Sequence, residues 1–280
     1  MDRVLYLLSP DFLFRDALLA SLIVGFVCPW VGVYFLLRRI VFLGIALPQI
    51  SSVGIALAVL GHNLGWIVSG DAGERWLPLV GSLAATIPAL LAFAILSTRH
   101  SEARIGAAFV LAGALGVLIV VADPVGEARS LALLKGDVLL VDRQGLEMIA
   151  IVCSFVLLGL IACHRELLLV SSDPDIAVTL GRSVLLWQLV LFSLVGLAIS
   201  AGVIVAGPVV TFGYLLLPPL AAVRIARGVL PLCLISSAFG AASALAGFYT
   251  SYRWNLPVGP CQVVAASSWL LIGSIRLRVG

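Results

Sequence analysis

Apolar residues form long blocks along this chain, and short polar segments separate the blocks. Eight blocks contain no Asp, Glu, Lys or Arg, and they cover residues 17–37, 40–70, 76–98, 105–122, 148–163, 183–223, 228–252 and 254–275. One helix crosses a bilayer with about 20 apolar residues, and lipid offers no hydrogen-bond partner to an open backbone. The pattern therefore predicts an all-α, polytopic transmembrane helical bundle of about nine helices. Eight is the alternative, because residues 148–163 barely span and must borrow flanking residues.

The longest block, residues 183–223, is about twice the length that a single membrane helix needs. Its 41 residues include the helix breakers Gly207 and Pro208. We therefore expect an out-and-back pair of helices whose turn and second arm are kinked or interrupted. Broken helices line the pathway in transporters, although Gly and Pro are also common in membrane helices generally. Tyr214 is accordingly a candidate pathway residue, and packing of its ring against the kink is the alternative.

The composition is typical of a membrane protein and excludes several kinds of chemistry. Of the 280 residues 62% are hydrophobic and 11% are charged, whereas soluble domains carry about 25% charged residues. Lys135 is the only lysine and does not lie in a Gly-x-x-x-x-Gly-Lys-Ser/Thr motif, so the chain is not itself a P-loop ATPase. The apolar blocks contain no Ser/His/Asp or Glu/Glu set of the kind that hydrolases use. The five cysteines lack the Cys-x-x-Cys spacing of a metal or redox site. We therefore predict no enzymatic activity and no cofactor, and the net charge of +3 does not indicate nucleic-acid binding.

Basic residues predict the orientation of the bundle. With the carboxyl end in the cytoplasm, ten of the 17 Arg and Lys residues lie in inner loops, while seven lie outside with ten of the 14 acids. This bias follows the rule that cytoplasmic loops are enriched in basic residues. We interpret residues 1–280 as one transmembrane domain embedded in membrane lipid. Segments 1–15 and 123–147 are expected at the outer membrane surface, and segment 165–182 is expected in the cytoplasm.

The cytoplasmic segment contains an acid, a small residue and a glycine at positions 1, 3 and 7 of Asp175-Ile-Ala177-Val-Thr-Leu-Gly181. The preceding residues, Ser171-Ser172-Asp173-Pro174, indicate the start of a helix. Ser171 or Ser172 can cap free backbone amides, and Pro174 can occupy the first turn. Gly181 is suited to end the helix in a left-handed conformation. We expect a helix of about two turns that stands free and fits a cleft on another protein. An ordinary capped loop helix is the alternative.

Six segments, spread in order along most of the chain, carry a family resemblance. They include Arg38-Arg39-Ile-Val-Phe-Leu-Gly44, Ser101-Glu-Ala-Arg-Ile105-Gly106, Leu134-Lys-Gly136-Asp137, Asp173-x-Asp175-x-Ala177-x-x-x-Gly181, Gly207-Pro-Val-Val-Thr-Phe-Gly-Tyr214 and Leu256-Pro257-x-Gly259-Pro260. Together they resemble the membrane permease of the bacterial zinc, manganese and iron ABC importers.

This resemblance implies a helical ABC-importer permease in the bacterial inner membrane. The permease would work with a second copy of itself, two ATP-binding ABC subunits and an extracytoplasmic substrate-binding protein. The cargo implied is a divalent metal ion (zinc, manganese or iron) or a metal-containing substrate. The ATP-binding subunit would couple through Asp173, Asp175, Ala177 and Gly181.

The sequence departs from this family at two positions that bear on metal binding. Where the family has Gly-Asp-Ala-Leu-x-His, this chain has Gly44-Ile-Ala-Leu-Pro-Gln49. Ile45 supplies no ligand, and Gln49 supplies only a neutral amide oxygen, which is a poor ligand for a transition metal. We therefore predict no metal site here. Either metal crosses along a weakly binding polar path, or the cargo is a chelate or another small solute; a non-transporting sensor or assembly module is a further alternative.

Gln49, Ser51 and Ser52 form a polar patch inside an otherwise apolar block. Polar side chains at membrane depth usually face protein or water, so we predict that this patch lies on the translocation pathway. The alternative is that the serine hydroxyls bond back to carbonyls of their own helix and that Gln49 bonds a neighbouring helix. His62 and His164 lie near the ends of apolar blocks and are interpreted as solvated side chains.

Overall fold

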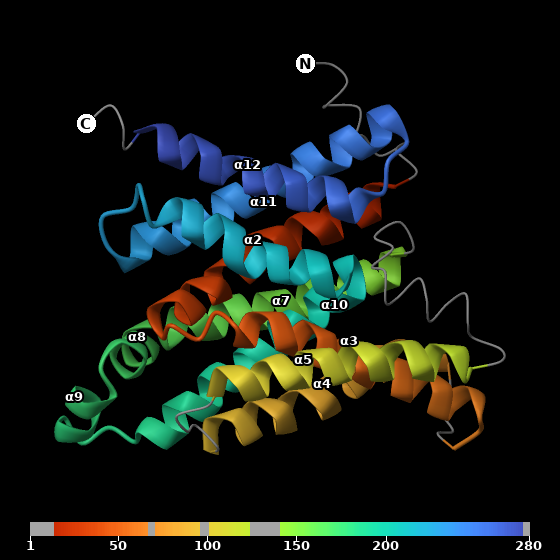
Figure 1. The fold of residues 1–280 in the computed structure, drawn as a ribbon, viewed down its shortest axis with the longest axis horizontal. Coiled ribbons are helices and arrows are strands. Elements are labelled where there is room, and N and C mark those ends of the chain that lie inside the picture. The colour runs from red at the N-terminus through yellow and green to blue at the C-terminus, as the bar shows by residue number, and fades with distance from the viewer. Residues whose placement is uncertain (1–13, 67–70, 96–100, 124–140, 277–280) are drawn as a thin grey trace.

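The computed structural model describes residues 14–66, 71–95, 101–123 and 141–276, and within these ranges every regular element is a helix (Figure 1). The long helices are α2 (Arg15–Leu37), α3 (Leu43–Asn63), α4 (Asp71–Ile95), α5 (Ser101–Val121), α7 (Arg143–Ala162), α10 (Val184–Ala222), α11 (Val229–Trp254) and α12 (Val258–Arg276). Two short helices, α8 (His164–Ser172) and α9 (Pro174–Thr179), lie between α7 and α10. The predicted all-α transmembrane bundle is confirmed.

The number of spanning segments fits the prediction of eight to nine. Among the described residues, seven helices are long and apolar enough to cross a membrane, and Val258–Leu271 forms a shorter apolar helix. The weakest predicted span does borrow flanking residues, because α7 begins at Arg143, where the side chain of Asp142 accepts a hydrogen bond from the Gly145 amide at 2.8 Å. The outer-surface segments predicted at 1–15 and 123–147 lie largely outside the described residues.

The longest helix, α10, reverses direction inside the protein. Gly207 has φ 78° and ψ 171°, a conformation that only glycine adopts readily, and it divides the 39 residues into two arms. The arms pack together beside the turn, where a Cβ on Gly202 would lie 2.7 Å from the Thr211 side chain. Thr211 also donates a hydrogen bond to the Gly207 carbonyl at 2.7 Å. The predicted out-and-back pair is therefore confirmed, with the turn at the Gly207-Pro208 dipeptide.

Three helices, α2, α3 and α10, form the centre of the bundle, and several others are mostly exposed. The apolar window of α2 is 78% buried and those of α3 and α10 are each 72% buried, whereas that of α5 is only 22% buried. The backbones of α2 and α10 approach closely, because a Cβ on Gly32 would lie 2.7 Å from the carbonyl carbon of Leu215. Small residues permit such approaches between membrane helices. The exposed apolar faces of α4, α5 and α7 match helices that face lipid.

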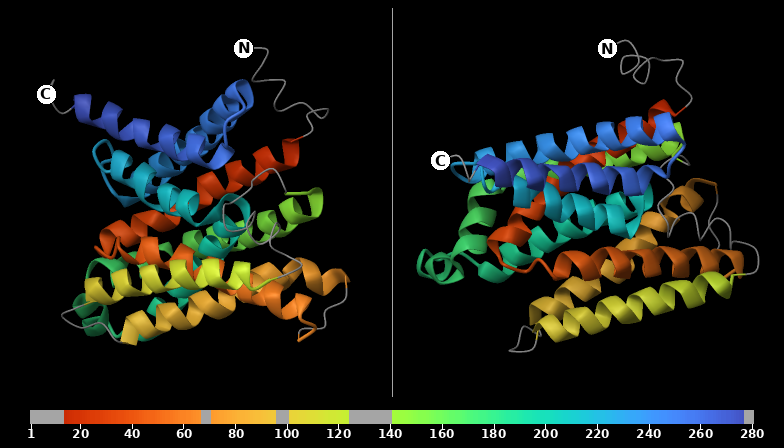
Figure 2. Two further views of the ribbon diagram at one scale, coloured as in Figure 1. Left: turned by 45° about the vertical axis from the view of Figure 1, so that its right-hand side comes forward. Right: turned by 45° about the horizontal axis from the view of Figure 1, so that its top comes forward.

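The arginine-rich turns share one end of the bundle with α8 and α9. This end contains the α2–α3 turn, the turn between α10 and α11, and the start of α5, and it lies on the left in Figure 1. The second views show α8 and α9 at the same end, beyond the long helices (Figure 2). The opposite end holds Asn63 and the start of α7. The predicted cytoplasmic segment at 165–182 therefore lies beside the predicted inner loops.

Candidate functional site

The predicted coupling segment begins at an aspartate. Asp173 is in an extended conformation, and its carboxylate accepts hydrogen bonds from the amides of Asp175 and Ile176, both at 3.1 Å. Pro174 occupies the first helical position, as predicted. The expectation that Ser171 or Ser172 caps this helix is wrong, because α8 continues through both serines before the chain turns at Asp173.

The segment ends at a glycine in the predicted conformation. Gly181 has φ 70°, and its amide donates to the Val178 carbonyl at 2.9 Å. The amide of Arg182 donates to the Ala177 carbonyl at 3.0 Å. These two bonds form a Schellman motif, which satisfies carbonyls that a helix end leaves free. The helix between the two caps has six residues, slightly fewer than two turns.

One face of α9 is anchored, and the other carries apolar side chains into solvent. Ala177 is fully buried, whereas Ile176, Val178 and Leu180 are 49%, 62% and 63% exposed. Apolar side chains exposed on a projecting helix at the arginine-rich end are of the kind that can bind another protein. Asp173 and Asp175 border this surface with negative charge. The role of this segment in coupling to an ATP-binding subunit stays a prediction.

Hydrogen bonds fix α8 to the bundle, and an ion pair joins α8 to the end of the segment that contains α9. Arg38, just after α2, donates to the Ser171 hydroxyl at 3.1 Å, and Arg182 forms an ion pair with Glu166 at 3.1 Å. The prediction that His164 is solvated is wrong, because its Nδ1 shares a hydrogen bond of 3.1 Å with the Tyr34 hydroxyl. Sequence reasoning missed these links, since 130 residues separate the partners in the Tyr34–His164 pair.

The polar patch in α3 contributes to contacts between helices. Ser51 is buried and shares a hydrogen bond of 2.5 Å with Ser82 in α4, which donates at 2.6 Å to Ser200 in α10. Ser52 is also buried and donates to the carbonyl of Gln49 at 2.7 Å, so it bonds back to its own helix as the alternative interpretation held. The hydroxyls of Ser51, Ser82 and Ser200 thus link α3, α4 and α10 at membrane depth.

Gln49 and Tyr214, the other pathway candidates, differ in their surroundings. Gln49 is partly exposed, and its Nε2 lies 3.5 Å from the place where a Cβ on Gly113 of α5 would be. Tyr214 is 1% exposed within the second arm of α10. The structure therefore leaves Gln49 as the accessible member of the predicted set, and the assignment of these residues to a pathway stays a prediction.

Metal-binding side chains do not gather within the described parts of the chain. No group of three or more His, Cys, Asp or Glu residues there is placed to hold a metal ion. Near the outer end of α3 the amide of Asn63 donates to both oxygens of the buried Asp123, at 2.9 and 3.1 Å. The five cysteines are free thiols.

Comparison with known proteins identifies the family. The sequence profile of the ABC 3 transport family matches residues 10–277, so the chain belongs to this family. The manganese import system permease protein ScaB of Streptococcus parasanguinis is 29% identical over 265 residues, which cover 92% of this chain and 88% of that protein. The manganese transport system membrane protein MntC of Halalkalibacterium halodurans is 27% identical, covering 94% and 86% of the two chains.

A solved structure shares the fold. The chain superimposes on PsaBC from Streptococcus pneumoniae, solved in complex with Fab, with a TM-score of 0.84 and 22% identity, covering 97% of this chain and 94% of that one. Membership of the ABC 3 transport family makes the protein a multi-pass membrane permease subunit of an ABC transporter, a class whose role is translocation. ATP hydrolysis belongs to a separate subunit of such transporters.

Proposed function

We propose that this chain is the permease of an ATP-driven importer for a divalent transition metal, with manganese as the first candidate. Family membership and two relatives named for manganese transport support this cargo. The observation that carries the mechanism is the capped helix α9, which presents three exposed apolar side chains at the arginine-rich end of the bundle. In this mechanism an ATP-binding subunit binds α9 through these apolar side chains.

The transport cycle follows from the attachment of α9 to the bundle. Closure of two ATP-binding subunits moves α9, and the movement is transmitted through the links from α8 and α9 to α2 and α10. A second copy of the chain completes the pathway, and a substrate-binding protein delivers cargo to its outer mouth. The span around Gln49 lines the path, so that metal passes among neutral oxygens which release it readily.

Uptake by intact cells tests this proposal. A strain lacking the gene should take up radioactive manganese more slowly than its parent, and the wild-type chain supplied from a plasmid should restore the rate. Zinc and iron uptake, measured in the same strains, identify the preferred ion. Equal uptake of all three metals by parent and deletion strain would refute the proposal.

A second cargo, a metal chelate or another small solute, is favoured by one observation. The positions where the resemblance implies Asp and His are occupied by Ile45 and Gln49, and Ile45 offers no ligand. Elemental analysis of the purified partner binding protein separates the two cargoes. Bound bare metal supports the first proposal, whereas an organic ligand bound with or without metal supports the second.

A further inference from the structure

A cavity of about 800 Å³ opens at the cytoplasmic end of the bundle, between the α2–α3 turn, the facing ends of α4 and α5, and the α8–α10 region. Its polar lining consists of three arginines, two serines and one glutamine, namely Arg38, Arg39, Arg104, Ser171, Ser172 and Gln188. None of its 16 lining residues is acidic. The cavity therefore combines a volume typical of small-molecule sites with a strongly positive lining.

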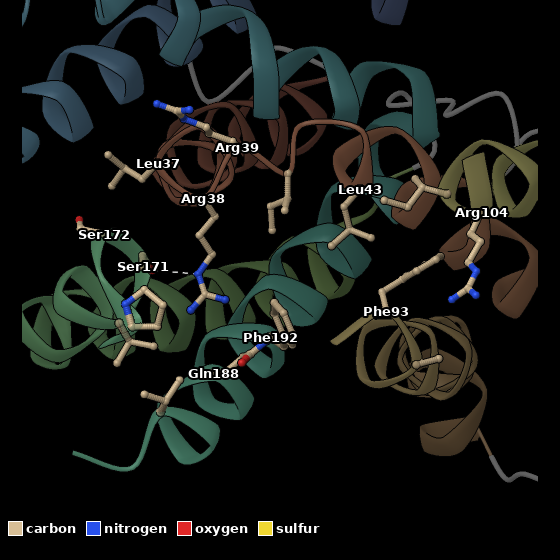
Figure 3. Close-up of a pocket in the computed structure, with 16 residues that line it drawn as sticks. Leu37, Arg38, Arg39, Leu43, Phe93, Arg104, Ser171, Ser172, Gln188 and Phe192 are labelled. Atoms are coloured by element: carbon tan, nitrogen blue, oxygen red, sulfur yellow. Dashed lines mark hydrogen bonds between the residues drawn. The ribbon is translucent and has the colours of Figure 1, made fainter. Parts of the chain in front are cut away.

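Arg38 and Arg104 enter the cavity from opposite sides (Figure 3). Arg38 extends from the α2–α3 turn toward Ser171, while Arg104 lies across the cavity beside Phe93, and Arg39 points away from Arg38 (Figure 3). The Arg38 guanidinium also lies over the Phe192 ring, 5.7 Å from its centroid. An anion between Arg38 and Arg104 would thus meet positive charge from two elements.

Arg38 is a partly buried cation that, in the described part of the chain, forms no ion pair with a carboxylate. Its polar partner there is the neutral Ser171 hydroxyl, and burial lowers the pKa of its guanidinium from the ordinary value. An arginine nevertheless stays charged, and a buried charge is costly unless it is paired. Of the acids nearby, Glu166 is already paired with Arg182, and Glu102 at the start of α5 is exposed and does not line the cavity. The cavity therefore favours an external anion.

The other walls of the cavity are apolar and lie next to membrane-facing helices. Leu43, Phe93, Ile105 and Phe192 line them. Arg38 follows the last residue of α2, and Arg104 lies in the first turn of α5, which places both charges at the level of the inner headgroups. Helices α4 and α5, which bound the cavity, are only 28% and 22% buried over their apolar windows, so they adjoin lipid. A soluble anion needs no such apolar wall, whereas a lipid does.

We propose that this cavity binds an anionic phospholipid of the inner leaflet, with the phosphate between Arg38 and Arg104 and the acyl chains along the apolar walls. Basic pockets between membrane helices on the cytoplasmic side are suited to such headgroups. Ser171, Ser172 and Pro174 also line the cavity, so the bound lipid touches the segment that leads into α9. The site is independent of the transported cargo, and it adds a lipid ligand to the proposed function.

Native mass spectrometry of the full-length chain, purified in detergent and titrated with phosphatidylglycerol or phosphatidylcholine, tests the site. The wild-type chain should bind phosphatidylglycerol more tightly than phosphatidylcholine. Each arginine near a headgroup contributes about a fivefold gain, so Arg38→Gln or Arg104→Gln should lower phosphatidylglycerol affinity about fivefold, and the double variant about 25-fold. Arg38→Lys, which keeps the charge, should retain the preference.

The matched control is Arg227→Gln, which removes an exposed positive charge at the same end but outside the cavity. It should bind phosphatidylglycerol like the wild type. Size-exclusion profiles identify any variant that misfolds, and Arg104→Gln, at an exposed position, keeps the test valid if Arg38→Gln fails to fold. Equal affinity for both lipids in the wild type, or equal losses in Arg104→Gln and Arg227→Gln, would overturn the proposal. Displacement of phosphatidylglycerol by excess inorganic phosphate would instead assign the cavity to a soluble anion.

Discussion

Gly181 offers a direct test of whether α9 transmits ATP-driven movement. A Cβ built on this glycine meets no atom within 4 Å, so a side chain there clashes with nothing outside its own backbone. Its φ of 70° is the source of the cost, because a left-handed conformation costs an L-residue about 1–2 kcal/mol, and more if the side chain is β-branched. A change of that size lowers the population of the capped helix end about five- to thirtyfold.

We expect Gly181→Val to reduce metal uptake per ATP hydrolysed, because the helix end would adopt other conformations and α9 would fit its partner poorly. The measurement compares ATP hydrolysis with manganese uptake in proteoliposomes that contain the permease and its ATP-binding subunit. Gly181→Ala should have a smaller effect than valine, and Gly181→Asn should have the smallest, since asparagine tolerates this conformation.

The control for this series is Gly106→Ala in α5, another open position near the arginine-rich end, where the glycine is helical. It should leave the ratio of uptake to hydrolysis unchanged, and alanine in a helix interior should stabilise the protein slightly. A native ratio in Gly181→Val would show that the left-handed cap has no part in coupling. A ratio that falls equally in the control would point to general damage to the bundle.

Three further outcomes are expected. Gly32→Ala should place a Cβ 2.7 Å from the Leu215 carbonyl carbon and destabilise the α2–α10 contact by about 1–3 kcal/mol or more. The yield of folded protein should therefore fall. A yield equal to that of Gly106→Ala would contradict the packing argument. Ser82→Ala removes the middle hydroxyl of the hydrogen-bonded chain between α3, α4 and α10 and should lower the free energy of unfolding by about 0.5–2 kcal/mol. The measurement is the thermal midpoint in detergent, and an unchanged midpoint would show that these hydrogen bonds do not stabilise the protein. Gln49→Leu should slow manganese uptake without lowering the thermal midpoint, whereas an unchanged rate would return Gln49 to a packing role.

The membrane-spanning helices were predictable because each one requires an uninterrupted run of about 20 apolar residues, and the length of such a run can be read directly from the sequence. The reversal in α10 was predictable for a related reason, since Gly207 and Pro208 fall near the middle of a block too long for one helix. Backbone chemistry likewise fixed the end of α9, where glycine alone adopts the required φ without cost.

Details that depend on distant partners could not be derived from local patterns. Ser171, Ser172 and Asp173 can all cap a helix, and the choice of Asp173 depends on α8 continuing through the serines. His164 looked solvated because its neighbours in sequence are polar, yet Tyr34 reaches it from another helix. The cavity around Arg38 could not be predicted for the same reason, because its walls come from seven helices.

The reversal at Gly207 has a consequence for the biogenesis of the protein. The return arm, residues 208–222, extends about 22 Å at 1.5 Å per residue, which is shorter than the roughly 30 Å of hydrocarbon it would need to cross alone. The turn also lies within the protein, where neighbouring helices shield polar backbone that lipid would not tolerate. The arm therefore cannot be inserted as an autonomous span. Its placement depends instead on packing against neighbouring helices, with Leu215 lying against Gly32 of α2 and Val263 of α12 lying beside Gly213.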